Sequence, residues 1–323
     1  MSARAWSAFA AISTLWGIPY LFIKIAVDDG VPPVFLAWSR VTLAAVVLLL
    51  LSHRAGVLAP ARAHLGRLAL YAVIEICIPF PLIAAGEQHV SSSLAAILIA
   101  AVPMLVALLA LRFDPAERAT GARAVGLVVG FAGVVALVGL DVTGDGSALL
   151  CALAILLAAV GYAAGPMILS RHLTGLDPRA LMAVALSFAA VILTPAALLA
   201  PPRHTPSGEA LASIVVLGLL CTAMAFVLFG TLIAEVGAGR ATVITYVAPI
   251  VAVALGVTVL GERPGAGAVA GLLLILAGSW LSTDGRLPPA LRSLGRRRAV
   301  RPAAAGASGP AGPTDARAAG AHA

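Results

Sequence analysis

Long apolar runs separated by short polar breaks make up most of the chain as far as residue 284. A helix needs about 20 mostly apolar residues to cross the hydrocarbon core of a bilayer. By that measure the chain predicts ten transmembrane helices, at 5–27, 33–52, 67–86, 93–112, 121–140, 147–170, 178–200, 210–234, 240–260 and 265–284. No segment alternates as a membrane β-strand does, so we expect an all-α membrane protein.

The breaks between these runs carry turn and charge signals, such as Asp28-Asp29-Gly30 and Gly261-Glu262-Arg263-Pro264. The weakest boundary separates the third and fourth helices, where Glu87-Gln88-His89 has to form the loop. We interpret Glu87 and His89 as solvated loop residues at the outer rim of the bundle.

The composition supports lipid as the main solvent, because 61% of residues are hydrophobic and only 11% are charged. Soluble domains carry about 25% charged residues. A sequence pI near 10.1 is typical of nucleic-acid binding, but here the basic residues lie in short loops and in the tail, without interleaved aromatics. We therefore expect no nucleic-acid partner. The three cysteines lie in apolar runs without metal-ligand spacing, so neither a metal nor a cofactor is expected.

The distribution of basic residues predicts the orientation, because cytoplasmic loops hold the excess of Lys and Arg. With the N-terminus inside, 17 of the 21 Lys and Arg residues fall in inside segments and only Arg203 and Arg263 fall outside. Both termini are therefore expected in the cytoplasm. The single lysine among many arginines and alanines suggests a GC-rich bacterial genome, and so a multi-pass protein of the bacterial inner membrane.

Residues 285–323 are rich in Arg, Ala, Gly and Pro and have no apolar period. Such a composition cannot bury enough surface to fold, so we expect a disordered basic cytoplasmic tail. Its Arg296-Arg297-Arg298 run is suited to contact anionic membrane lipid.

The two halves of the chain, 1–144 and 145–284, resemble each other at a fixed offset. Thirteen residues separate Val90 from Pro103, and thirteen separate Val236 from Pro249. Each half has five predicted helices, and because five is odd the second repeat should enter the membrane from the opposite face. Inverted repeats around a central site are typical of secondary transporters. The alternative is that duplication only built a larger bundle.

Two Gly-x-x-x-Gly patterns, Gly126 to Gly130 and Gly267 to Gly271, lie in the fifth and tenth predicted helices. Small residues at this spacing let helices pack closely. We expect them to seat neighbouring helices of the same chain instead of driving dimerisation, and the sequence specifies no oligomeric state.

Several motifs follow one another in a specific order and spacing along the two halves. They are Leu15-Trp16-Gly17 followed by Lys24 and Arg40, the run from Ser93 to Pro103, Thr245-Tyr246 with Pro249, and Leu260-Gly261-Glu262-Arg263. Together they resemble the EamA-like family of the drug/metabolite transporter superfamily, over roughly residues 10–284. The resemblance implies a ten-helix exporter of small metabolites, amino acids or drugs, with its substrate cavity between the two halves.

The first repeat departs from the family pattern at one place. It has Phe113-Asp114-Pro115-Ala116-Glu117 where the family usually shows Leu-Gly-Glu. Glu262 is therefore the closer match of the two motif acids, and Glu117 the weaker one.

Glu75 is the most informative single residue, because it lies near the middle of the third helix between Ile74 and Ile76. An acid at that depth costs about 2.5–3.5 kcal/mol on insertion scales and usually faces a cavity or a partner. Burial favours the neutral form of a carboxyl, so Glu75 is a candidate for proton coupling or substrate binding. The alternative is a structural Glu paired with Arg40 or with a backbone carbonyl.

Arg40 is predicted about 10 Å below the outer surface, from seven residues at 1.5 Å each. It is a candidate to bind an anionic substrate, or else to pair with Glu75. Lys24 is close to the outer end of the first helix, where its stem can snorkel to the interface.

Four aromatic residues with polar tips, Trp16, Tyr20, Tyr162 and Tyr246, lie inside spans instead of at their ends. They line a cavity or simply pack. Pro103 and Pro249 occupy matching positions in the repeats, and we interpret them as paired hinges or kinks.

These observations predict a secondary transporter, an exporter of small molecules, with no enzymatic activity. The alternative is a membrane-embedded enzyme acting on a lipid-phosphate substrate. That would require clustered carboxylates for metal ions or a nucleophile with its base, and neither pattern is present in the sequence.

Overall fold

The structure, a computed structural model, describes residues 3–113, 121–142, 146–236 and 244–282. All regular elements in these ranges are helical, which confirms the all-α prediction. Eight helical stretches are long and apolar enough to cross a membrane, and two shorter apolar helices occupy the ninth and tenth predicted positions. The count of ten crossings stays a prediction.

The elements follow the predicted spans closely. In chain order they are α1 (Ala3–Gly17), α2 (Pro19–Asp28), α3 (Pro33–Arg54), η1 (Ala59–His64), α4 (Leu65–Ala72), η2 (Val73–Cys77), α5 (Pro79–Gly86), α6 (Ser92–Ile99), α7 (Val102–Phe113), α8 (Ala122–Asp141), α9 (Gly146–His172), α10 (Pro178–Leu199), α11 (Gly208–Val215), η3 (Val216–Met224), α12 (Ala225–Val236), α14 (Ile244–Val259) and α15 (Ala266–Ser282).

Several spans depart from a regular α-helix inside the bundle. The first span breaks between α1 and α2, just before Pro19, and the fourth breaks between α6 and α7, just before Pro103. By contrast, α14 runs through Pro249 without a break. The third and eighth spans each contain a π-helical segment, η2 and η3. The two prolines at matching repeat positions therefore have different local structures.

Helices that hold the same place in the two repeats pack against each other, α3 on α10 and α8 on α15. Other contacts between the repeats are exchanged. The third span packs on α9, which begins the second repeat, while the eighth span packs on α1 and α2, which begin the first. These two contacts are equivalent when the repeats are interchanged, as an approximate two-fold axis between the repeats produces.

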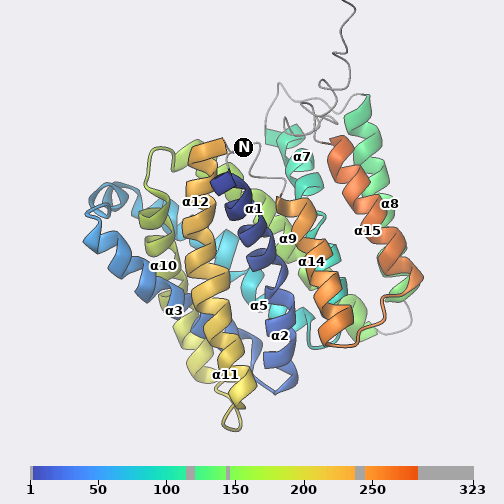
Figure 1. The fold of residues 1–323 in the computed structure, drawn as a ribbon, viewed down its shortest axis with the longest axis horizontal. Coiled ribbons are helices and arrows are strands. Elements are labelled where there is room, and N and C mark those ends of the chain that lie inside the picture. Colours follow the sequence, from blue (N-terminus) through green and yellow to red (C-terminus); the bar gives the residue numbers. More distant parts are fainter. Residues whose placement is uncertain (1–2, 114–120, 143–145, 237–243, 283–323) are drawn as a thin grey trace, which may run out of the picture.

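The start of α1 and the end of α15 lie at the same end of the bundle, the upper end in Figure 1. The loops after α2, α10 and α14 lie at the opposite end. This arrangement is the one that an even number of crossings requires. We call the end formed by residues 28–33, 200–208 and 260–266 the arginine-poor end. Its extracytoplasmic location remains a prediction.

Glycines line the contact between α8 and α15. A Cβ on Gly133 would lie 2.8 Å from the backbone nitrogen of Ile275, and a Cβ on Gly271 would lie 2.8 Å from Cβ of Leu137. The Gly-x-x-x-Gly patterns thus seat neighbouring helices within the chain, as predicted from their spacing.

This contact should be sensitive to a single methyl group. A Cβ on Gly278 would overlap backbone atoms of Gly130, so Gly278→Ala has to move one helix. Overpacking costs about 1–3 kcal/mol, which corresponds to a loss of roughly 3–10 °C in melting temperature. The control is Gly139→Ala on α8, where a Cβ meets nothing within 4 Å. Thermal unfolding of the detergent-purified protein measures both, and an equal shift would contradict the close helix contact.

The predicted crossing pattern can be tested by labelling. Asp28 and Ala59 are both exposed, at the two ends of the span formed by α3. In a background without the native cysteines, Asp28→Cys and Ala59→Cys should react with a membrane-impermeant maleimide from opposite faces. Labelling of both from the same face of intact cells would refute this topology.

Candidate substrate and proton site

Arg40 lies buried on α3 at the contact between the two repeats. Its Nε donates a hydrogen bond of 2.8 Å to Oγ1 of Thr222, in η3 of the second repeat. Its guanidinium carbon lies 4.1 Å from the centroid of the Phe80 ring. Within the described ranges, no carboxylate forms a salt bridge with this guanidinium and no hydrogen bond engages its two terminal amino groups. Those groups are the ones that bind a carboxylate in a fork.

Thr222 is held in place by its own helix. Its hydroxyl donates to the backbone carbonyl of Leu217, 2.8 Å away, inside the π-helical segment. The same oxygen accepts from Arg40, so the orientation of the guanidinium depends on this local bond. Thr222 is not among the predicted site residues, because its contact with Arg40 forms only when the two repeats pack together.

Glu75 lies in the other π-helical segment, η2. Its Oε2 is buried and has no hydrogen-bond partner among the described residues. Gly165 of α9 faces this carboxyl directly, because a Cβ at Gly165 would overlap Oε2. The structural alternative of a Glu75–Arg40 ion pair is therefore not found in the described part of the chain.

Tyr162 lies between the two charged residues. It is close enough to interact electrostatically with both Arg40 and Glu75. Its ring packs on Phe80 at 6.4 Å between centroids, with an interplanar angle of 78°. The predicted candidates Arg40, Glu75 and Tyr162 thus belong to one buried polar cluster, which Phe80 and Thr222 complete.

The aromatic contact recurs in the second repeat. The 146 positions that separate Pro103 from Pro249 also separate Trp16 from Tyr162 and Phe80 from Phe226. Trp16 packs on Phe226 at 5.9 Å and 69°, close to the geometry of its counterpart. The repeat offset could therefore have identified Phe80 from the sequence.

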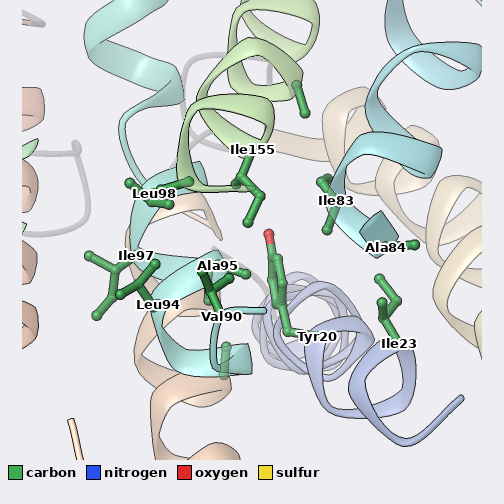
Figure 2. Packing of buried hydrophobic residues seen from close by; sticks show 14 of the residues in the cluster. Tyr20, Ile23, Ile83, Ala84, Val90, Leu94, Ala95, Ile97, Leu98 and Ile155 are labelled. Atoms are coloured by element: carbon green, nitrogen blue, oxygen red, sulfur yellow. The ribbon is translucent and has the colours of Figure 1, made fainter. Parts of the chain in front are cut away.

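The two remaining aromatic candidates are placed differently. Tyr20 is buried, and Figure 2 shows it among Ile23, Ile83, Ala84 and Val90, with its hydroxyl directed toward Ile155. It is also near enough to Tyr162 and Arg40 to interact electrostatically. Tyr246 is partly buried on α14.

Lys24 is a structural anchor near the arginine-poor end. Its Nζ donates to the backbone carbonyl of Glu87 at 2.9 Å and forms a salt bridge of 2.9 Å with Asp28. The side chain is 20% exposed, so its charged head reaches the edge of the bundle.

The interpretation of Glu87 as a solvated loop residue is wrong. Glu87 is completely buried, and neither carboxylate oxygen has a hydrogen-bond partner among the described residues. Side chains from α2 and from the loop before α15 gather around it, which only the tertiary structure reveals. His89 is exposed, as predicted.

Glu262 of the Gly-Glu motif caps a helix of the other repeat. Its Oε1 accepts from the backbone nitrogen of Ser92 at 2.7 Å, and its Oε2 accepts from that of Ser93 at 3.0 Å. Gly261 has a φ of 65°, the left-handed conformation that favours glycine. A carboxylate at a helix N-terminus is stabilised by the free amides and the helix dipole. Glu117, its predicted counterpart, lies outside the described residues.

Neither a metal centre nor a nucleophile with its base is recognisable at this site. The described ranges contain no group of three His, Cys, Asp or Glu residues placed to hold a metal ion. Cys77, Cys151 and Cys221 form no disulfide bond with one another. The arrangement fits reversible binding of a polar ligand by Arg40 and Glu75.

The buried polar cluster between two helical repeats is typical of membrane transporters with several spans. The model of the EamA-like transporter family matches residues 4–139 and 149–283, one match per repeat. The chain belongs to the EamA-like transporter family.

Relatives support the same class. The chain is 32% identical to a protein of Streptantibioticus cattleyicolor named "Probable terminal-alkyne amino-acid exporter", over 92% of this chain and 97% of that one. It is 29% identical to the "Uncharacterized inner membrane transporter YedA" of Escherichia coli K12, over 79% of this chain and 82% of that one. A protein of known crystal structure shares the fold at a TM-score of 0.61 and 21% identity, covering 90% of this chain and 99% of that one.

The cap at Glu262 should stabilise the contact between repeats. We expect Glu262→Ala to lower the melting temperature by roughly 2–8 °C, because lost caps cost about 1–2 kcal/mol. Glu262→Gln should lose less, since its amide oxygen still accepts. Glu209→Ala, an exposed acid in the first turn of α11, is the matched control. Thermal unfolding measures all three, and equal losses would argue against the cap.

Proposed function

We propose that this protein is a secondary transporter that exports small molecules carrying an anionic group, amino acids among them. The site would be exposed alternately to the two sides of a bacterial inner membrane. One observation carries the proposal: a buried arginine without a salt bridge and a half-buried carboxyl whose Oε2 is buried and unpartnered lie in one cluster between the repeats.

The binding role of Arg40 follows from its energetics. An uncompensated charge inside a membrane bundle is costly, and an anionic ligand would supply the missing counter-charge. The ring of Phe80 holds the guanidinium from one side, and Thr222 fixes Nε. The terminal amino groups are then oriented for a carboxylate. The amino-acid exporter named among the relatives is consistent with this ligand chemistry.

The coupling role of Glu75 follows from its lack of partners. No described residue donates a hydrogen bond to Oε2 and Arg40 forms no ion pair with it, so burial of this oxygen favours the neutral carboxyl, and hydration of the site would allow the proton to leave. Substrate and proton would thus bind to neighbouring groups. Proton movement down its gradient could then drive export.

The two repeats supply the alternating movement. Their exchanged contacts give two related ways of packing the same helices, which is the basis of rocking in carriers with inverted repeats. The alternative of an enzyme that acts on a lipid phosphate receives no support from these relatives, because they are named as transporters or exporters. The inner-membrane location rests on the arginine distribution and on the name of the E. coli relative.

Flux in proteoliposomes tests the coupling. We expect a pH gradient to accelerate efflux of the substrate by the wild-type protein. Glu75→Gln should reduce efflux to the rate without a gradient, because the amide cannot carry a proton. Metabolites that accumulate in the medium of an overexpressing strain identify the substrate to load.

Glu209→Gln, which neutralises an exposed acid, should leave the gradient effect intact. Arg40→Lys should weaken substrate binding while preserving charge, because an ammonium cannot form the forked contact. A pH-driven flux unchanged in Glu75→Gln would reassign Glu75 to a structural role.

A further inference from the structure

Glu87 is a second buried carboxyl that the proposed transport site does not use. It forms the C-cap of α5, at the end of the span that carries Glu75. Its side chain is 0% exposed, and both carboxylate oxygens lack a hydrogen-bond partner among the described residues. Lys24 donates to its backbone carbonyl and not to its carboxylate.

Burial and the neighbouring acids oppose a negative charge on Glu87, whereas Lys24 and Arg40 partly offset this opposition. Three residues of α2 are near it: Lys24, Asp28 and Tyr20. Arg40 approaches it from α3 and Glu262 from the loop before α15. On α9, the Cys151 thiol donates to the carbonyl of Ala85 nearby. Neither cation bonds to the carboxylate: Lys24 pairs with Asp28, and the Nε of Arg40 donates to Thr222. The C-terminus of α5 adds the negative end of a helix dipole.

Glu87 also lies beside a contact between the two repeats. Five residues further along the chain is Ser92, whose backbone amide donates to Glu262 of the second repeat. Ser92 is itself fully buried, and its hydroxyl has no partner among the described residues. The junction of α5, α6 and the loop before α15 therefore closes over an unpartnered carboxyl.

We propose that Glu87 is a proton-binding site that links closure of the arginine-poor end to the uptake of one proton. The proposal rests on the alternating exposure argued above. When the loop that carries Glu262 packs on α6, Glu87 loses water and gains no hydrogen-bond donor, so it has to be neutral. When the contact opens, water reaches the carboxyl and the proton leaves. Low pH on this side therefore favours the closed form, and high pH favours the open form.

A reporter of opening tests this without measuring transport. Ser92→Cys, in a background without the native cysteines, places a thiol of similar size at the buried junction. Thr205→Cys, on the exposed loop at the same end, provides a reference. The ratio of their labelling rates with a maleimide removes the part of the pH dependence of thiol reactivity that the two sites share.

In the otherwise wild-type protein we expect this ratio to rise between about pH 5 and about pH 8. The rise can reach about tenfold per pH unit, the limit for linkage to one proton. Glu87→Gln should keep the ratio low and flat, because the amide mimics the neutral acid. Glu87→Asp retains a carboxyl and should retain the rise, and Glu209→Gln should behave as the parent.

A flat ratio in the parent protein, or an unchanged rise in Glu87→Gln, would overturn the proposal. If Glu87→Gln fails to fold, Glu87→Met offers an apolar side chain of similar length and is read in the same way. Glu75→Gln separates the two proposals: it should keep the pH-dependent labelling ratio while losing gradient-driven flux. Flux that persists in Glu75→Gln contradicts the transport coupling alone, whereas a flat ratio contradicts the role of Glu87 alone.

Discussion

Inside a bilayer every backbone amide and carbonyl needs a partner, and this requirement governs both the helices and their irregular segments. The two π-helical segments lie within the bundle, where neighbouring protein groups can satisfy the backbone atoms that an irregular helix leaves free. In η3 the hydroxyl of Thr222 bonds to the carbonyl of Leu217 and then accepts from Arg40. A backbone irregularity and the orientation of the candidate binding group thus depend on one side chain. Such segments often mark functional sites.

The scaffold is nearly symmetric, whereas its polar groups are not. The contacts of Trp16 with Phe226 and of Tyr162 with Phe80 have similar geometries in the two repeats. At the offset that relates these pairs, Arg40 corresponds to Leu186 and Glu75 to Cys221, and both counterparts are buried. The aromatic packing is therefore common to both repeats, whereas the two charged residues of the cluster, Arg40 and Glu75, both belong to the first repeat. Charged groups from only one repeat are sufficient to bind a ligand that is itself asymmetric.

Apolar length predicted the spans well because the hydrocarbon thickness sets it. Expected ranges of 33–52 and 178–200 correspond to Pro33–Arg54 and Pro178–Leu199. The π-helical segments could not be predicted, since they depend on packing between repeats. Glu75 could be identified as a candidate because it is an acid in an apolar run. Glu87 lies in a predicted loop, and it is buried by residues that are distant in sequence. Local pattern identifies charges within spans and misses charges that tertiary contacts bury at span ends.

The third span carries both unpartnered acids, and their spacing gives each a different relation to the repeats. Twelve residues separate Glu75 from Glu87, about 18 Å along a helix. Glu75 faces Gly165 beside the Arg40 cluster, whereas Glu87 lies under the contact that Glu262 makes with α6. A ligand bound at the cluster would thus affect Glu75, whereas closure of the contact would affect Glu87. Both acids belong to the third span, so a movement of α5 that hydrates Glu87 would also shift the neighbouring η2 segment, which carries Glu75, relative to α9.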